Sequence, residues 1–184
     1  MPAARPPIDC DVHPTCPGLK ALLPYMDDMW REMVVRRGIE DLNTISYPTT
    51  NPLSFRQDWR DTTGRTGTTP QVLAAQAMEP FGTGTAILNC SYGTQAVFSE
   101  DMAAAFCRAL NGWIAREWLD VDPRMRASIV VPMLNAEHAV DEIDHWAGDT
   151  RFVQVLLLVN GEVPLGRRNL WPIYAAAERH GLPI

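Results

Sequence analysis

Short apolar runs alternate with longer amphipathic stretches along the whole chain. The apolar runs cover residues 7–13, 84–91, 126–134 and 152–159. They have the length and the β-branched content of strands buried on both faces of a parallel sheet. Apolar residues at helical spacing fill the segments between and after them, at 18–37, 70–82, 100–114, 136–148 and 168–181. This alternation predicts an α/β fold, either an open doubly wound sheet or a β/α barrel, and the pattern does not choose between the two.

Local signals mark the ends of several predicted helices. Thr69, Ser99 and Asn135 stand where N-caps are expected, because their side-chain oxygens can accept a hydrogen bond from the first helical turn. Gly38 and Gly181 stand where a helix ends in the left-handed conformation that glycine adopts without strain. These signals divide the chain at the same points as the hydrophobic pattern does.

Residues 39–68 form a long segment rich in Thr, Pro, Asn, Asp and Gly, in which Tyr47, Phe55 and Trp59 are embedded. A loop of this length inside a compact domain is uncommon and is often a lid or a binding loop. A solvated insertion ordered by its own aromatic residues explains the composition equally well. Both interpretations stay open on the sequence alone.

Composition narrows the class of protein. The 184 residues are 46% hydrophobic and 21% charged, with a net charge of −6 and a pI near 5.1, which fits one globular domain and disfavours a nucleic-acid partner. No apolar run is long enough for a membrane span, and the N-terminus lacks a secretory pattern. Four scattered cysteines indicate free thiols. We therefore expect a cytoplasmic protein that binds neither nucleic acid nor a membrane.

Nucleotide chemistry is also disfavoured. Lys20 is the only lysine, so a P-loop is absent, and no G-x-G-x-x-G sequence occurs. In both candidate architectures, chemistry gathers at the carboxyl ends of the parallel strands. Polar residues at those ends include Asp11 and His13 after the first run, Asn89 after the second and Asn160 after the fourth.

The first strand ends in the sequence IDCDVHP. Alternate side chains of a strand share one face, so Asp9, Asp11 and His13 project to one side. A carboxylate and an imidazole two residues apart can both reach one divalent cation. The same spacing also fits an aspartate that caps nearby amides beside a hydrogen-bonded histidine. Spacing alone leaves both interpretations open.

IDCDVHP at one end and WPIYAAAERHGLPI at the other resemble the amidohydrolase-2 family, the branch related to aminocarboxymuconate-semialdehyde decarboxylase. The resemblance implies a (β/α)8 TIM barrel, of which residues 1–184 hold strands 1–4 and the start of strand 5, with an insertion at about 39–68. It also implies one divalent metal, Zn²⁺ or alternatively Mn²⁺, with Asp11 and His13 as ligands and Asp9 in support. Many relatives have a histidine where Asp11 stands.

The family's remaining ligands and its proton-transfer aspartate are expected beyond Ile184, so the catalytic residues are unknown. His138, His145 and His180 lie on predicted helices and are interpreted as surface residues. None of them completes a three-ligand site.

The resemblance implies a metal-dependent hydrolase or a non-oxidative decarboxylase acting on a small carboxylated or carbonyl substrate. Substrate contacts are expected from Arg56, Trp59, Asn89 and Asn160, and the full-length protein is expected to be a homo-oligomer. One alternative is a truncated barrel half without activity, serving as a remnant or interaction domain. Another is an open α/β ligand-binding domain without metal.

Overall fold

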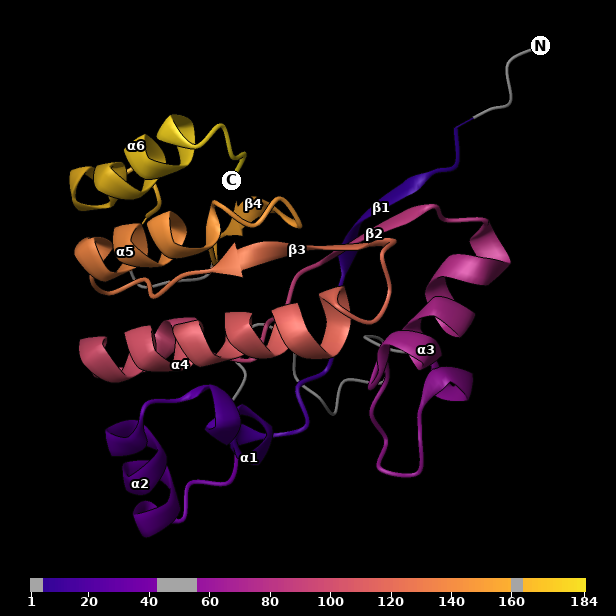
Figure 1. The fold of residues 1–184 in the computed structure, drawn as a ribbon, viewed down its shortest axis with the longest axis horizontal. Helices are drawn as coiled ribbons and strands as arrows, with labels where there is room; N and C mark the ends of the chain where they lie inside the picture. The colour runs from indigo at the N-terminus through magenta and orange to yellow at the C-terminus, as the bar shows by residue number, and fades with distance from the viewer. Residues whose placement is uncertain (1–4, 43–55, 160–163) are drawn as a thin grey trace.

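The computed structural model describes residues 5–42, 56–159 and 164–184. Four parallel strands form one sheet in the order of the chain, β1-β2-β3-β4 (Figure 1). They are β1 (Ile8–Val12), β2 (Thr85–Leu88), β3 (Met125–Val130) and β4 (Phe152–Leu156). The main helices are α1 (Leu19–Leu22), α2 (Asp28–Arg37), α3 (Pro70–Leu73), α4 (Glu100–Ile114), α5 (Ala136–Trp146) and α6 (Trp171–Arg179).

Consecutive strands lie side by side and are joined through helical segments, which is the connectivity of a β/α barrel rather than of a sheet that reverses direction at a switch point. The long helix α4 packs against β3 and α5, and α5 packs against α6 (Figure 1). Phe106 and Leu110 of α4 and Ile143 of α5 are fully buried. Burying one such side chain contributes about 1.5–3 kcal/mol, so this layer fixes the sheet on its helical side.

Most of the predicted helix ends are confirmed. Thr69 Oγ1 accepts a hydrogen bond from the Val72 amide at 3.2 Å, and Asn135 Oδ1 caps α5. Gly38 ends α2 with a φ of 62°. Ser99 precedes α4 as expected, but its side chain makes no capping hydrogen bond, so that part of the prediction is wrong.

The predicted helix at 18–37 is two helices. Pro24 lies in a short 3-10 turn, η1 (Leu23–Tyr25), after which Met26 and Asp27 are extended. Proline has no amide hydrogen to continue the helical ladder, so the chain turns here and restarts at α2. Arg31 of α2 closes the turn by donating to carbonyls of η1 and Met26.

The two outer strands differ from the expected burial on both faces. Of β1 only Val12 is buried, and Ile8 is 61% exposed; β1 is an edge strand of the described sheet. At the other edge the Val155 amide donates to the Pro183 carbonyl at 2.9 Å. The segment after α6 therefore returns to β4, as predicted for the start of a fifth strand.

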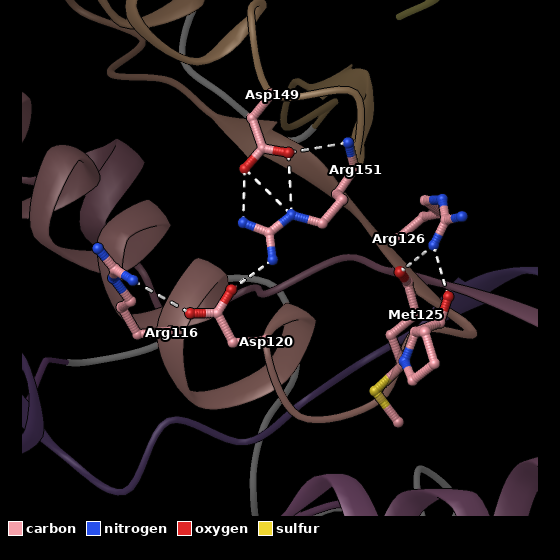
Figure 2. A network of polar contacts seen from close by, with 7 residues as sticks. Arg116, Asp120, Met125, Arg126, Asp149 and Arg151 are labelled. Atoms are coloured by element: carbon pink, nitrogen blue, oxygen red, sulfur yellow. Dashed lines mark hydrogen bonds and ion pairs between the residues drawn. The ribbon is translucent and has the colours of Figure 1, made fainter.

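The amino ends of β3 and β4 are closed by ion pairs (Figure 2). Arg151 binds Asp149 through two nitrogens and also contacts Asp120, which Arg116 approaches at 3.3 Å. These guanidinium groups hold the pKa of Asp120 and of Asp149 below its usual range. The network fastens the end of the sheet that is opposite to Asp11 and His13.

Within the described segments, no helix combines the length and the apolar character needed to cross a membrane. Cys10 is exposed and the other three cysteines are buried, and all four are free thiols.

Candidate metal centre

Asp11 and His13 lie together at the carboxyl end of β1. His13 Nε2 is 3.2 Å from Asp11 Oδ1, and the two side chains are 33% and 71% exposed. Asp9 lies on the same strand and accepts a hydrogen bond from the Asp11 amide at 3.2 Å. The strand therefore presents a carboxylate and an imidazole side by side, as its alternation predicts.

The neighbouring strand fixes the histidine ring. His13 Nδ1 is 2.8 Å from the Asn89 carbonyl oxygen, just after β2. A carbonyl only accepts hydrogen bonds, so Nδ1 carries the proton in the neutral ring and Nε2 faces the Asp11 carboxylate. This is the arrangement in which metal-binding histidines are commonly held, with one ring nitrogen donating to a backbone carbonyl.

The donor pair fits two positions around one divalent ion. Ligands about 2.0–2.2 Å from the same ion lie about 3.0–3.5 Å from each other, which includes the observed separation of Nε2 and Oδ1. No set of three metal-binding side chains among His, Cys, Asp and Glu is grouped within the described residues. Asp11 and His13 are thus two side chains whose separation would suit a shared ion, and the described residues group no third such side chain with them.

The nearby thiols are poor additional ligands. Burial raises the pKa of Cys16 to about 12 and the pKa of Cys90 well above its usual value. In the structure the Cys16 thiol donates to the Gly18 carbonyl and the Cys90 thiol donates to the Pro14 carbonyl. Asp11 and His13 would offer an ion one carboxylate oxygen and one imidazole nitrogen.

A cavity of about 330 Å³ adjoins the pair. It runs along β1 from Asp9 to His13, and residues between Leu73 and Phe81 form the facing wall. Gly67 closes one end with a φ of 55°, and a Cβ there would lie only 3.2 Å from the His13 carbonyl. The backbone conformation and the close contact therefore favour glycine at this position.

Arg56 and Trp59 line this cavity together with Asp11 and His13, so four of the six predicted site residues meet there. Trp59 is half-buried and its ring lies under the Arg56 guanidinium at 4.9 Å. Arg56 also binds Asp58 through two nitrogens at 3.0 and 2.6 Å. A carboxylated substrate would have to compete with Asp58 for that guanidinium.

The outcome is different for the other two residues that were predicted to contact a substrate. Asn160 lies outside the described residues. Asn89 is buried, and its side-chain amide makes its hydrogen bonds within the protein, so the expected contact between Asn89 and a substrate has no support in this geometry. Of the histidines expected at the surface, His138 of α5 pairs with Asp101, and His180, which directly follows α6, pairs with Asp144.

Ser128 and Gln154 were not among the predicted site residues, although they reach the Asp11–His13 pair through Asn89. They extend from β3 and β4 to Asn89 and complete a polar chain across the strands. A signal was present for Gln154, which is the only polar residue of β4, whereas β3 contains Arg126 as well as Ser128. A buried polar residue in such a position needs partners, and here these partners lead to Asp11.

The chain was compared with protein-family models, curated sequences and solved structures. The family model described as amidohydrolase (Amidohydro_2) matches residues 8–184. No curated protein sequence matches the chain significantly.

Among solved structures, 5-carboxyvanillate decarboxylase from Novosphingobium aromaticivorans, with bound manganese and 3-methoxy-4-hydroxy-5-nitrobenzoic acid, matches with a TM-score of 0.65 and 18% identity. The match covers 98% of this chain and 50% of that one. 2,6-Dihydroxybenzoate decarboxylase from Rhizobium matches with a TM-score of 0.57 and 18% identity, over 98% and 49% of the two chains.

The chain spans about half the length of these structures. At such low identity they show the fold, and the family model shows the membership. The connectivity, the strand-end pair and the family match agree: this chain belongs to the amidohydrolase family and forms part of its β/α barrel.

Proposed function

We propose that this chain belongs to a metal-dependent enzyme that removes a carboxyl group from a small carboxylated substrate without oxidation. Hydrolysis of a related carbonyl compound is the variant of the same proposal. Decarboxylation is favoured because both structural relatives described above are decarboxylases by name.

The pair formed by Asp11 and His13 is the observation that carries the proposal. Its donor atoms are spaced as ligands of one ion, lie at the carboxyl end of a barrel strand and border a cavity. A bound divalent ion would supply a Lewis acid that polarises a substrate oxygen or activates water. Zn²⁺ and Mn²⁺ both accept oxygen and nitrogen donors, and the manganese of the carboxyvanillate decarboxylase makes Mn²⁺ the first ion to test.

The chain's own residues would orient the substrate. Trp59 offers an aromatic face against which a planar ring can stack, and it lies in the same cavity as the Asp11–His13 pair. Arg56 would hold a carboxylate through paired nitrogens if Asp58 releases it. We also propose a cytoplasmic protein that acts on a small molecule, binds neither nucleic acid nor a membrane, and forms a homo-oligomer at full length.

A second candidate is a barrel half that binds the ion weakly and has no activity by itself. The observation that favours it is that the described residues group no third metal-binding side chain with Asp11 and His13. The two candidates share the metal pair and differ in turnover.

A titration with Mn²⁺, followed by electron paramagnetic resonance of the unbound ion, tests the pair. We expect one saturable site in the 184-residue chain and no measurable binding in an Asp11→Ala, His13→Ala double variant. The matched control is an Asp101→Ala, His138→Ala double variant. It removes an Asp–His pair on the helical surface whose two atoms are almost the same distance apart as those of Asp11 and His13. Equal binding by wild type and both variants would reject the metal pair.

Turnover is measured with the Mn²⁺-loaded chain. Release of CO₂ from 5-carboxyvanillate or 2,6-dihydroxybenzoate, lost in the Asp11 and His13 double variant, is expected of a decarboxylase. Saturable Mn²⁺ binding without turnover of any carboxylate tested would favour the inactive half.

A further inference from the structure

The Asn89 side chain lies at the centre of a hydrogen-bonded chain that crosses the sheet. It is 6% exposed and follows β2 directly. Its Nδ2 donates to Asp11 Oδ1 at 2.9 Å and to the Cys10 carbonyl at 3.2 Å. Its Oδ1 accepts from Ser128 Oγ and from Gln154 Nε2, the latter at 3.3 Å.

These four contacts use the whole capacity of the amide. A primary amide has two N–H donors and two acceptor lone pairs, and each has a partner here. No capacity is left for a substrate. A residue at a strand end beside a cavity, yet fully engaged with protein groups, acts on those groups.

The partners also fix which way the amide points. The Asp11 carboxylate and the Cys10 carbonyl only accept hydrogen bonds, so the nitrogen must face them. A reversed amide would set oxygen against oxygen there and nitrogen against Gln154 Nε2. Gln154 further donates to Ser128 Oγ at 2.9 Å, which leaves the serine hydroxyl to donate to Asn89. Ser128 of β3 and Gln154 of β4 therefore determine that the nitrogen of the Asn89 amide faces Asp11.

The same residue holds the histidine through its backbone, since the Asn89 carbonyl accepts from His13 Nδ1. We propose that Asn89 is the positioning residue of the metal pair: its side chain orients Asp11, its main chain orients His13, and Ser128 and Gln154 fix the amide that does so. This inference rests on the proposed function only in assigning the pair to a metal; the orientation itself is tested without one.

The metal-dependent test compares two buried asparagines. Asn111 of α4 is fully buried; its amide exchanges hydrogen bonds with the Val130 backbone at 2.8 and 2.9 Å and donates to Glu142 at 2.8 Å, and none of these partners is Asp11 or His13. We expect Asn89→Leu to weaken Mn²⁺ binding by about 10- to 100-fold, the usual effect of losing a group that orients a ligand. Asn111→Leu should lower stability comparably and leave the affinity of the folded protein within about twofold. Equal Mn²⁺ affinities in the two variants would overturn the inference.

The metal-free test uses the side-chain amide resonances of Asn89 in the wild-type chain and in Asp11→Ala. We expect both Nδ2 protons to exchange slowly with solvent, and one of them to shift upfield and exchange faster when Asp11 is removed. Rapid exchange in the wild type, or no response to Asp11→Ala, would overturn the inference whatever Asn89→Leu does. If the expected amide signals are found but no Mn²⁺ binds, the positioning role stands and the proposed function falls.

Discussion

Two Asp–His pairs of this protein are nearly identical in the distance between the two residues and in the exposure of their side chains. Asp11 and His13 lie 3.2 Å apart with 71% and 33% exposed side chains, and Asp101 and His138 lie 3.1 Å apart with 78% and 31%. The first pair sits on one strand end, whereas the second bridges α4 and α5. Distance and exposure therefore do not distinguish a candidate site from a surface contact.

The two pairs differ in the buried residues that hold their side chains. Asp11 and His13 are both held by Asn89, which is itself held from two further strands. No comparable buried support for the Asp101 and His138 side chains is found in the described part of the chain. An exposed pair of that kind gains about 0–1 kcal/mol and reorients easily. Support by buried neighbours is what gives a pair the fixed geometry that a metal needs.

The largest expected effect comes from making the same substitution in each region. Asn89→Asp places a carboxylate against the Asp11 carboxylate and the Cys10 carbonyl, and we expect it to cost about 3 kcal/mol of unfolding free energy. Asn135→Asp keeps the N-cap of α5, because Asp and Asn cap equally well. Its cost should stay within about 0.5 kcal/mol, including weak repulsion from Glu100. Urea unfolding with a chelator present measures both, and equal losses would erase the contrast between the two regions.

A smaller effect is expected from Ser128→Ala. The serine is fully buried, and its loss leaves Asn89 Oδ1 with the Gln154 contact alone. We expect about 1 kcal/mol of lost stability and a several-fold weaker Mn²⁺ affinity, less than for Asn89→Leu. Calorimetric titration of the folded variant measures the affinity. An affinity equal to that of the wild type would show that Asn89 keeps its orientation without β3.

The smallest effect is expected at a third Asp–His contact, between Asp144 of α5 and His180 at the end of α6, to which Arg179 also contributes. His180 and Arg179 hydrogen-bond to Asp144 at 2.7 and 2.6 Å and hold the pKa of its carboxyl below its usual range. A lowered pKa in the folded state means that the contribution to stability is present above about pH 4 and is lost as pH falls through the folded value.

Asp144→Asn should therefore lower stability at pH 7 by less than about 1 kcal/mol, since the group is half exposed. The difference from the wild type should shrink toward pH 3. Urea unfolding at both pH values and low salt measures it. A difference that grows with acidity would contradict the assignment of Asp144 as the ionised partner.

Sequence was sufficient where the determining interactions are local. Thr69 and Asn135 cap the helices that follow them, and Gly38 takes the left-handed conformation, because each needs only its own few neighbours. The pairing of Asp11 with His13 was also local, since a strand places alternate residues on one face.

Prediction failed where segments that are distant along the chain determine the exposure or the partners of a residue. The exposure of Ile8 depends on what packs against β1, and the role of Asn89 depends on residues from three other strands. The spacing at 18–37 predicts one helix with a buried apolar face, but after the break at Pro24 Met29 of that segment is 63% exposed. In each case spacing along the chain carried no information about the partner.

The hydrogen bond from the Val155 amide to the Pro183 carbonyl ties α6 to the far edge of the sheet. The polypeptide leaves β4, passes through α6 and is brought back to the same strand by this contact. Fraying at the end of α6 would uncover the Val155 amide, and loosening of β4 would detach the last residues. Helix and edge strand should consequently open together, as one cooperative unit.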